Sequence, residues 1–243
     1  METIFNSLIK AFYLIVTLDK SFTEIVVLSF KVSGGALILA SLIGLPLGAF
    51  MALRNFPLRN TLFAIVNALL GLPPVLVGLL LYLFLSRRGP LGFLSILYTP
   101  YAMVIAQSIL AFPHICAISA SAIRGVNPNL RLLCKTLGAT EFQTALTIIR
   151  EARFGIITAV MAAFGRVISE VGAILIVGGN ILGVTRVMTT AIVLETDKGD
   201  FELALALGIV LLSVSLVINT LVIKIQSRYV HLSQSERGFF SVR

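Results

Sequence analysis

Apolar residues gather in five stretches, each long enough to form a membrane-spanning helix, at about residues 25–53, 62–85, 100–123, 155–178 and 202–225. A helix of roughly 20 residues crosses a hydrocarbon core of about 30 Å. Because unpaired backbone groups cannot face lipid, each stretch is expected to be helical. No internal repeat or low-complexity linker divides the chain. The pattern therefore predicts an all-α polytopic membrane protein with one domain over residues 1–243.

A shorter apolar stretch, Ile4–Leu18, precedes the first span and is too short to cross a membrane. Ile4, Leu8, Phe12 and Ile15 share one face of a helix, which predicts an amphipathic helix lying at the membrane surface. A signal peptide is the less favoured alternative, because no small-residue cleavage site precedes the next charged residues.

The composition agrees with a membrane protein, because 58% of the residues are hydrophobic and only 12% are charged. The net charge of +8 could also indicate a nucleic-acid partner. In membrane proteins, however, Lys and Arg accumulate in cytoplasmic loops. With the N-terminus outside, the inner segments carry eleven Lys and Arg residues and the outer segments six. We therefore expect a multi-pass cell-membrane (inner-membrane) protein with an outer N-terminus, a cytoplasmic C-terminus, the lipid bilayer as its surroundings and no nucleic acid.

The second span is interrupted near its middle by Gly71, Pro73 and Pro74. Proline removes a backbone donor and clashes with the preceding turn, so a kink or a short unwound segment is expected there. Such backbone is tolerated at membrane depth where protein covers it or where it lines a wet cavity. Both interpretations, a packing kink and a pore-lining break, remain open.

The segment from about 124 to 153 is the longest polar connection and carries signals for two short helices. Asn127 is a good N-cap, Pro128 suits the first helical position, and Gly138 can end the helix. Thr140 with Gln143 three residues later forms a capping box for a second helix. An idle surface loop seldom carries two well-marked helices, so a docking element for a cytoplasmic partner is predicted.

The residues of this turn, Lys135, Thr136, Leu137, Gly138, Ala139 and Thr140, followed by Ile148-Ile149, resemble the cytoplasmic loop of ABC importer permeases. That loop normally reads Glu-Ala-Ala, three residues, Gly, nine residues and Ile-x-Leu-Pro. Here Leu132-Leu133-Cys134 and Arg150-Glu151 stand in place of its two ends. The resemblance implies that residues 135–140 couple this chain to an ATPase.

The resemblance extends along most of the chain and is strongest to the molybdate, tungstate and sulfate branch. It rests on the segments 72–78 with 88–92, 165–173 with 179–180, and 186–192 with 198–200, the last of which most resembles the tungstate permeases. It implies a type I, molybdate-permease-like fold, a homodimer of permease chains, cytoplasmic ATP-binding subunits and an extracytoplasmic oxyanion-binding protein. It also implies that ATP and magnesium bind to the partner subunit and that this chain carries no cofactor.

Arg166, Ser169 and Glu170 place polar groups inside the fourth span. Arg166 and Glu170 are four residues apart and would share one helical face, so an ion pair is expected. Charged side chains in spans generally face the bundle interior or a cavity. The pair could fix helix packing, or Arg166 could add positive potential along an oxyanion route.

Several other activities lack the residues that they would need. Gly178 and Gly183 have phosphate-loop spacing, but no Lys-Ser/Thr follows, and neither HExxH nor GxSxG occurs. The two cysteines and two histidines form no metal-binding pattern. The family resemblance makes a tungstate importer subunit the first hypothesis, with molybdate or sulfate as alternative cargo. An intramembrane enzyme, a polytopic assembly factor and a stand-alone channel are the alternatives outside that class.

Overall fold

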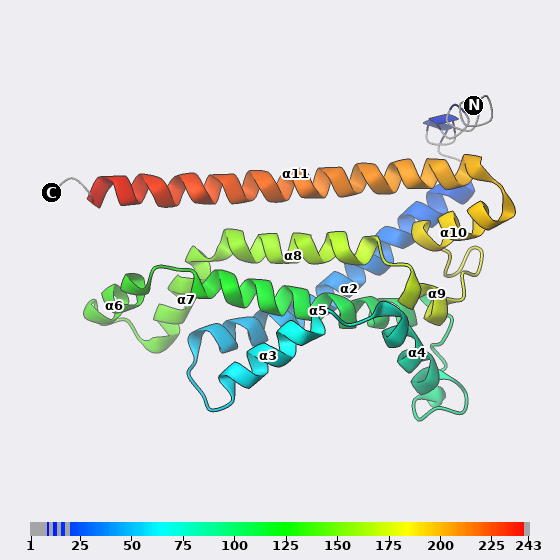
Figure 1. The fold of residues 1–243 in the computed structure, drawn as a ribbon. Helices are drawn as coiled ribbons and strands as arrows, with labels where there is room; N and C mark the ends of the chain where they lie inside the picture. The colour runs from blue at the N-terminus through cyan, green and yellow to red at the C-terminus, as the bar shows by residue number, and fades with distance from the viewer. Residues whose placement is uncertain (1–8, 10–11, 14–15, 18–19, 241–243) are drawn as a thin grey trace. The chain divides into compact units, whose positions relative to one another are not determined.

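The computed structural model describes residues 9, 12–13, 16–17 and 20–240, with side chains up to residue 224. Its regular elements are helices, drawn in Figure 1. The prediction of an amphipathic helix over 4–18 falls largely outside the described residues. The elements are α2 (Lys20–Leu53), α3 (Arg59–Leu69), α4 (Pro74–Leu85), the short 3₁₀ helix η1 (Gly92–Leu94), α5 (Pro100–Arg124), α6 (Pro128–Thr136), α7 (Glu141–Glu151), α8 (Arg153–Ile168), α9 (Gly172–Gly178), α10 (Met188–Lys198) and α11 (Phe201–Phe240).

Three of these helices, α2, α5 and α11, are each long and apolar enough to cross a bilayer. Two further pairs, α3 with α4 and α8 with α9, meet this criterion together, each bent at a break of four residues or fewer. If each bent pair is one span, the five apolar stretches of the sequence correspond to five crossings. The all-α fold is confirmed in the described part of the chain, although α11 continues well beyond the predicted span, to Phe240.

The chain forms two compact units, each assembled from three separate segments. Unit 1 comprises residues 1–40, 72–111 and 164–216, and unit 2 comprises residues 41–71, 112–163 and 217–243. Four helices, α2, α5, α8 and α11, contribute turns to both units. The expectation of one domain over 1–243 stays a prediction.

Unit 1 has a core in which α2, α4, α5 and α9 meet. Val32, Val77, Met103 and Val177 are buried there with small residues such as Ala106. Small side chains let helix backbones approach closely, which is the usual way that helices pack where lipid gives no hydrophobic drive. The chain before α5 is tied to the same core, because the Tyr98 amide donates to the Val177 carbonyl oxygen at 2.9 Å.

A second cluster in unit 1 buries α10 between α2 and α11. It contains Phe22 and Ile25 of α2, Met188 and Ala191 of α10, and Leu207 of α11. The backbone of α10 is also anchored, since the Met188 amide donates to the Ser29 hydroxyl at 2.8 Å. Residues 188–191 are thus part of the core of this unit and not a loose surface segment.

Unit 2 joins the last turns of α2 to α5 through a close glycine contact. A Cβ atom on Gly48 would stand 2.5 Å from the Ser119 hydroxyl and 2.8 Å from the Cys116 carbonyl oxygen. Ile123 of α5, Ile148 of α7 and Ala152 form a further buried cluster in this unit. These contacts fasten α7, and the loop it belongs to, onto the end of the long helices.

Candidate functional site

Helix α6 begins and ends through local interactions that the sequence predicts. The Asn127 side-chain oxygen accepts the Asn129 amide at 3.0 Å, and Pro128 occupies the first turn. At the other end, Gly138 adopts a φ of 76°, and the Ala139 amide donates to the Cys134 carbonyl oxygen at 3.0 Å. A residue in this left-handed conformation ends a helix, and glycine adopts the conformation without steric cost. The roles of Asn127 and Gly138 as helix caps are therefore confirmed.

Helix α7 begins with the predicted capping box. The Thr140 hydroxyl accepts the Gln143 amide at 3.3 Å, while the Gln143 side-chain oxygen accepts the Thr140 amide at 2.8 Å. Two of the amides that a helix start leaves unsatisfied are thereby paired. Only four residues, 137–140, separate the two helices, so their relative orientation is set by this turn.

An ion-pair cluster joins α6 to α7 across the turn. The Glu141 carboxylate lies 2.9 Å from the Lys135 ammonium and 3.4 Å from the Arg131 guanidinium. The hydrogen bonds to Lys135 and then to Arg131 lower the pKa of Glu141 below its ordinary value. All three side chains are well exposed, so the cluster orients the turn more than it stabilises the fold.

The same two helices present large apolar side chains to their surroundings. Leu132, Leu137 and Phe142 expose 65%, 78% and 78% of their surface, whereas Ile148 on the other side of α7 is buried. Thr136 contributes to helix order, because its hydroxyl donates to the Leu133 carbonyl oxygen at 2.8 Å. An apolar patch made of these exposed side chains, on a helix–turn–helix held by two caps, is typical of a protein docking surface.

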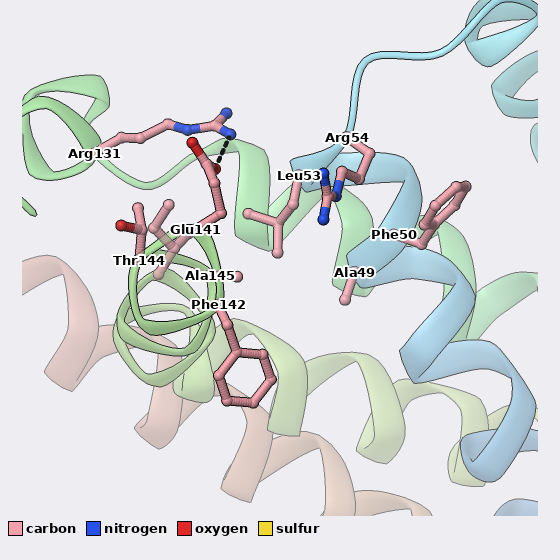
Figure 2. A pocket seen from close by; sticks show the side chains of 10 residues that line it. Ala49, Phe50, Leu53, Arg54, Arg131, Glu141, Phe142, Thr144 and Ala145 are labelled. Carbon is pink, nitrogen blue, oxygen red and sulfur yellow. Dashed lines mark hydrogen bonds and ion pairs between the residues drawn. The ribbon is translucent and has the colours of Figure 1, made fainter. Parts of the chain in front are cut away.

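A cavity of about 410 Å³ lies beside this surface in unit 2, between the end of α2 and α7. Figure 2 shows Phe50 and Arg54 on the α2 side and the linked Arg131–Glu141 pair on the other. The Thr144 hydroxyl in its wall is buried and has no hydrogen-bond partner in the described part of the chain. The cavity is continuous with the exposed Phe142, so it extends the apolar patch toward the α2 helix.

The predicted break at Gly71, Pro73 and Pro74 is present and ends one helix before the next begins. Helix α3 stops at Leu69, the Gly71 amide donates to the Ala68 carbonyl oxygen at 3.2 Å, and Pro74 opens α4. Proline at the first helical position has no amide to leave unsatisfied. The prediction of an interruption is therefore confirmed, while its role in lining a pore stays a prediction.

Within unit 1, α4 is in backbone contact with α9, the second half of the other bent pair. A Cβ atom on Gly78 would stand 2.9 Å from the Ala173 Cα, and one on Gly172 would stand 2.8 Å from a methyl group of Val75. The start of α4, just after Pro73 and Pro74, therefore lies against the start of α9. The structure brings together two regions that the sequence singled out separately.

The expected ion pair between Arg166 and Glu170 is wrong. Helix α8 ends at Ile168, so the two residues do not share a helical face, and no ion pair joins them in the described part of the chain. Glu170 is buried and its carboxylate accepts the Ala173 amide at 3.4 Å, while Arg166 is exposed. The main-chain carbonyl oxygen of Glu170 accepts a hydrogen bond from the Thr189 hydroxyl at 2.8 Å, which fixes the break against α10.

Ser169 is exposed and its hydroxyl is engaged with its own helix end. It donates to the carbonyl oxygens of Gly165 and Arg166 at 3.0 and 3.1 Å. Back-bonding of this type caps a helix end and bends the chain. Arg166 and Ser169 thus remain on an exposed face of unit 1, and Glu170 does not.

A polar cluster in the segment after α9 was not predicted from the sequence. Glu195 is buried, and its carboxylate lies 3.5 Å from the Arg186 guanidinium and 3.1 Å from the Lys198 ammonium. Arg186 also donates to the Asn180 carbonyl oxygen at 3.4 Å, and its Nε is buried without a partner in the described residues. The spacing of Glu195 and Lys198, three residues apart on one helix, is the only local signal of this cluster.

A family model for the binding-protein-dependent transport system inner membrane component matches residues 44–231. This chain belongs to that family. It is 42% identical to the tungstate uptake system permease protein TupB of Peptoclostridium acidaminophilum, over 93% of this chain and 99% of that protein. It is also 42% identical to a probable anion ABC transporter permease protein of Haloferax volcanii, over 84% of this chain and 90% of the relative.

The fold agrees with this membership. A crystal structure of an amino acid ABC transporter with histidines superimposes with a TM-score of 0.65 and 18% identity, covering 88% of this chain and 96% of that one. At this identity the similarity shows the fold alone. The chain is thus a multi-pass membrane permease with an all-α transporter fold.

Proposed function

We propose that this chain is the permease subunit of an ATP-driven tungstate importer. The observation that carries the proposal is the 42% identity, over nearly the full length of both chains, to a tungstate uptake permease. The family is defined by dependence on a binding protein, so an extracytoplasmic protein would deliver the oxyanion. Molybdate or sulfate is the alternative cargo, because these tetrahedral dianions have the same charge and similar shapes.

The α6–α7 turn is proposed to receive the ATP-binding subunit. Residues 135–140 form a short turn held by two caps and an ion-pair cluster, and the apolar side chains of Leu137 and Phe142 are exposed beside it. A rigid element transmits a displacement without absorbing it, which is what coupling ATP hydrolysis to a helix movement needs. ATP and magnesium would be bound by that partner, not by this chain.

We further propose a homodimer with the N-terminus outside and the C-terminus in the cytoplasm. Arg166 is exposed on α8 and Ser169 just after its end, both within a predicted span, and a charged side chain is costly in contact with lipid. A second copy of the chain would cover this face or enclose a wet path beside it. The break at Gly71–Pro74, which could line the same path, is supported by its packing against the start of α9.

The direct test is uptake by proteoliposomes that contain this chain, its ATP-binding subunit and its binding protein. We expect ATP-dependent accumulation of radiolabelled tungstate and competition by molybdate. Uptake of sulfate or an organic solute with no uptake of tungstate would overturn the substrate assignment. Failure of an ATP-binding subunit to co-purify with the chain would instead contradict the importer model and favour a stand-alone channel.

A further inference from the structure

A second cavity, of about 190 Å³, lies in unit 1 between α2 and the segment that follows α9. Its charged lining consists of Glu24 and Lys31 from α2 and Arg186 from the loop before α10. Val27 and Leu182 supply apolar walls, and both are exposed at its mouth. The cavity is therefore small, open on one side and lined by two cations and one carboxylate.

The face of α2 that lines this cavity is unusual for a membrane helix. Glu24, Val27 and Lys31 recur at intervals of three and four residues, so they lie along one exposed stripe of the helix, whose only other charged residue is Lys20 at its start. Two ionisable groups on one stripe of a span mark a surface that faces water or protein and not lipid. This stripe is therefore expected to border a wet part of the transporter.

Arg186 is held in place as a wall of the cavity by groups behind it. Its guanidinium is paired with the buried Glu195 at 3.5 Å and donates to the Asn180 carbonyl oxygen at 3.4 Å, while its buried Nε has no partner among the described residues. Lys31 differs, because its ammonium makes no hydrogen bond or ion pair within the described part of the chain. The cavity thus combines one fixed guanidinium with one free ammonium.

We propose that this cavity is a transient binding station for the tetrahedral dianion, in which Lys31 supplies the charge that attracts it. The proposal rests on the proposed function of the chain as an oxyanion permease. A dianion needs positive groups along its route, and they must not bind it so tightly that it cannot leave. Glu24, two helical turns from Lys31 on the same stripe, limits the attraction, and Glu195 offsets part of the Arg186 charge. Lys31 is consequently the charge whose removal changes the station most.

The test places a cysteine at position 31 and sets its charge chemically. The variant Lys31→Cys is made in a Cys116→Ser, Cys134→Ser parent and reconstituted with the ATP-binding subunit and the binding protein. A thiosulfonate reagent that attaches a trimethylammonium-ethyl group restores a positive charge, and one that attaches a sulfonatoethyl group adds a negative charge. Reaction with either reagent also reports that the position faces water.

We expect Lys31→Cys to lower the initial rate of tungstate uptake by about tenfold, since one unit charge at close range is worth about that factor in a partly hydrated site. The positive reagent should recover most of the rate, and the negative reagent should lower it further. ATP hydrolysis stimulated by the loaded binding protein should persist in all three states. Lys20→Cys, on the same helix but outside the cavity, is the matched control and should respond to neither reagent.

Equal uptake rates with either charge at position 31, or no reaction of the thiol, would overturn the proposal. If the wild-type chain moves no tungstate in the same assay, the proposed substrate fails instead, so the two failures are distinguishable. The phosphate of an anionic lipid has similar chemistry to an oxyanion. The assay is therefore run in vesicles of phosphatidylcholine alone and in vesicles that also contain phosphatidylglycerol, and a charge effect confined to the second would assign the cavity to lipid and overturn the proposal.

Discussion

A Cβ atom on Gly78 would stand 2.9 Å from the Cα of Ala173, closer than side-chain atoms approach backbone in real structures. The contact joins α4 to α9, the halves of the two bent pairs that lie in unit 1. The Cα of Ala173 belongs to the backbone and cannot rotate away as the tip of a flexible side chain could. The two helices would therefore have to move apart to admit a methyl group at position 78. The absence of a side chain at position 78 is therefore a condition for this crossing.

Gly78→Ala should destabilise the folded permease by about 1–3 kcal/mol, the usual cost of overpacking a tight core. Ordinarily Gly→Ala within a helix is stabilising by up to about 1 kcal/mol. Gly208→Ala in α11 is the matched control, because its added Cβ meets nothing within 4 Å. The measurement is the temperature at which each purified variant loses its monodisperse profile in detergent. Equal transition temperatures for wild type and Gly78→Ala would show that α4 and α9 move apart at little cost, which would contradict the prediction.

The turn between α6 and α7 gives a second prediction, based on backbone conformation alone. Gly138 has a φ of 76° and open space around it, so a side chain there is strained but not blocked. Gly138→Val should lower ATP-coupled uptake severalfold while the chain still inserts in the membrane, because the left-handed conformation costs a branched residue about 1–2 kcal/mol. Gly138→Asn should retain most activity, since asparagine tolerates this conformation.

The comparison of these two variants separates strain from bulk. Uptake and ATP hydrolysis are both measured with the reconstituted ATP-binding subunit. Loss of uptake in Gly138→Asn as well as in Gly138→Val would indicate that uptake depends on the lack of a side chain at position 138, and not on the φ angle of the residue. Full activity in both would remove the turn from the coupling mechanism.

The Glu141 cluster predicts how the turn responds to pH. Because the pKa of Glu141 is lowered by Lys135 and then Arg131, its contribution to order is present above the ordinary carboxyl range and is lost only as the pH falls through the lowered value. Amide exchange of α6 and α7 should therefore show no pH dependence from this group near neutral pH, where its contribution is fully present. Glu141→Gln should speed exchange in the 131–141 region at neutral pH, and Glu151→Gln, at the far end of α7, should not. Equal protection in wild type and Glu141→Gln would mean that the two caps alone hold the turn.

Orientation is tested with the two cysteines. Cys134 is partly exposed on α6, whereas Cys116 is buried on α5 beside Met51. A membrane-impermeant maleimide should label Cys134 in inverted vesicles and not in intact cells, and it should not label Cys116 in the Cys134→Ser variant. Labelling of Cys134 from outside intact cells would contradict the proposed cytoplasmic position of the loop.

The loop helices could be predicted from sequence because their signals are local. Asn127, Pro128, Gly138, Thr140 and Gln143 act within three or four residues of themselves, and each does what its position indicates. The break at Gly71–Pro74 is local for the same reason, since proline cannot continue the preceding turn. The spans could be predicted from the length of each apolar stretch, because a membrane-spanning helix is recognised by its own length and composition.

The break between α8 and α9 could not be predicted in this way. The residues there, Ser169-Glu170-Val171, include no proline or glycine, and the segment reads as continuous helix. It is held by a hydrogen bond from Thr189, nineteen residues away, and by contact of Gly172 with Val75. Long-range contacts of this kind overrode the helical spacing of Arg166 and Glu170, which is why the expected ion pair is absent. The Arg186–Glu195 ion pair could not be predicted for the same reason, because the fold of the chain, and not helical spacing, brings the two residues together.

The Arg186–Glu195 pair leads to the last prediction. Their side chains expose only 14% and 7% of their surface, so each is largely removed from solvent. Glu195→Gln should destabilise the permease by about 3 kcal/mol, because it leaves the largely buried Arg186 guanidinium without a counter-charge. Asp197→Asn, two residues away and exposed, is the matched control and should change stability little.

The decisive measurement is a double-mutant cycle on thermal stability in detergent. Adding Arg186→Gln to Glu195→Gln removes the stranded charge, so the double variant should be more stable than Glu195→Gln alone. Lys198 does not replace Arg186 in this argument, because its ammonium is half exposed and can return to water when the carboxylate is lost. If the double variant is no more stable than the single one, the two charges contribute independently. The pair would then not be what holds the α9–α10 segment in place, and the hydrogen bonds of Asn180 and Thr185 to neighbouring backbone would have to do so.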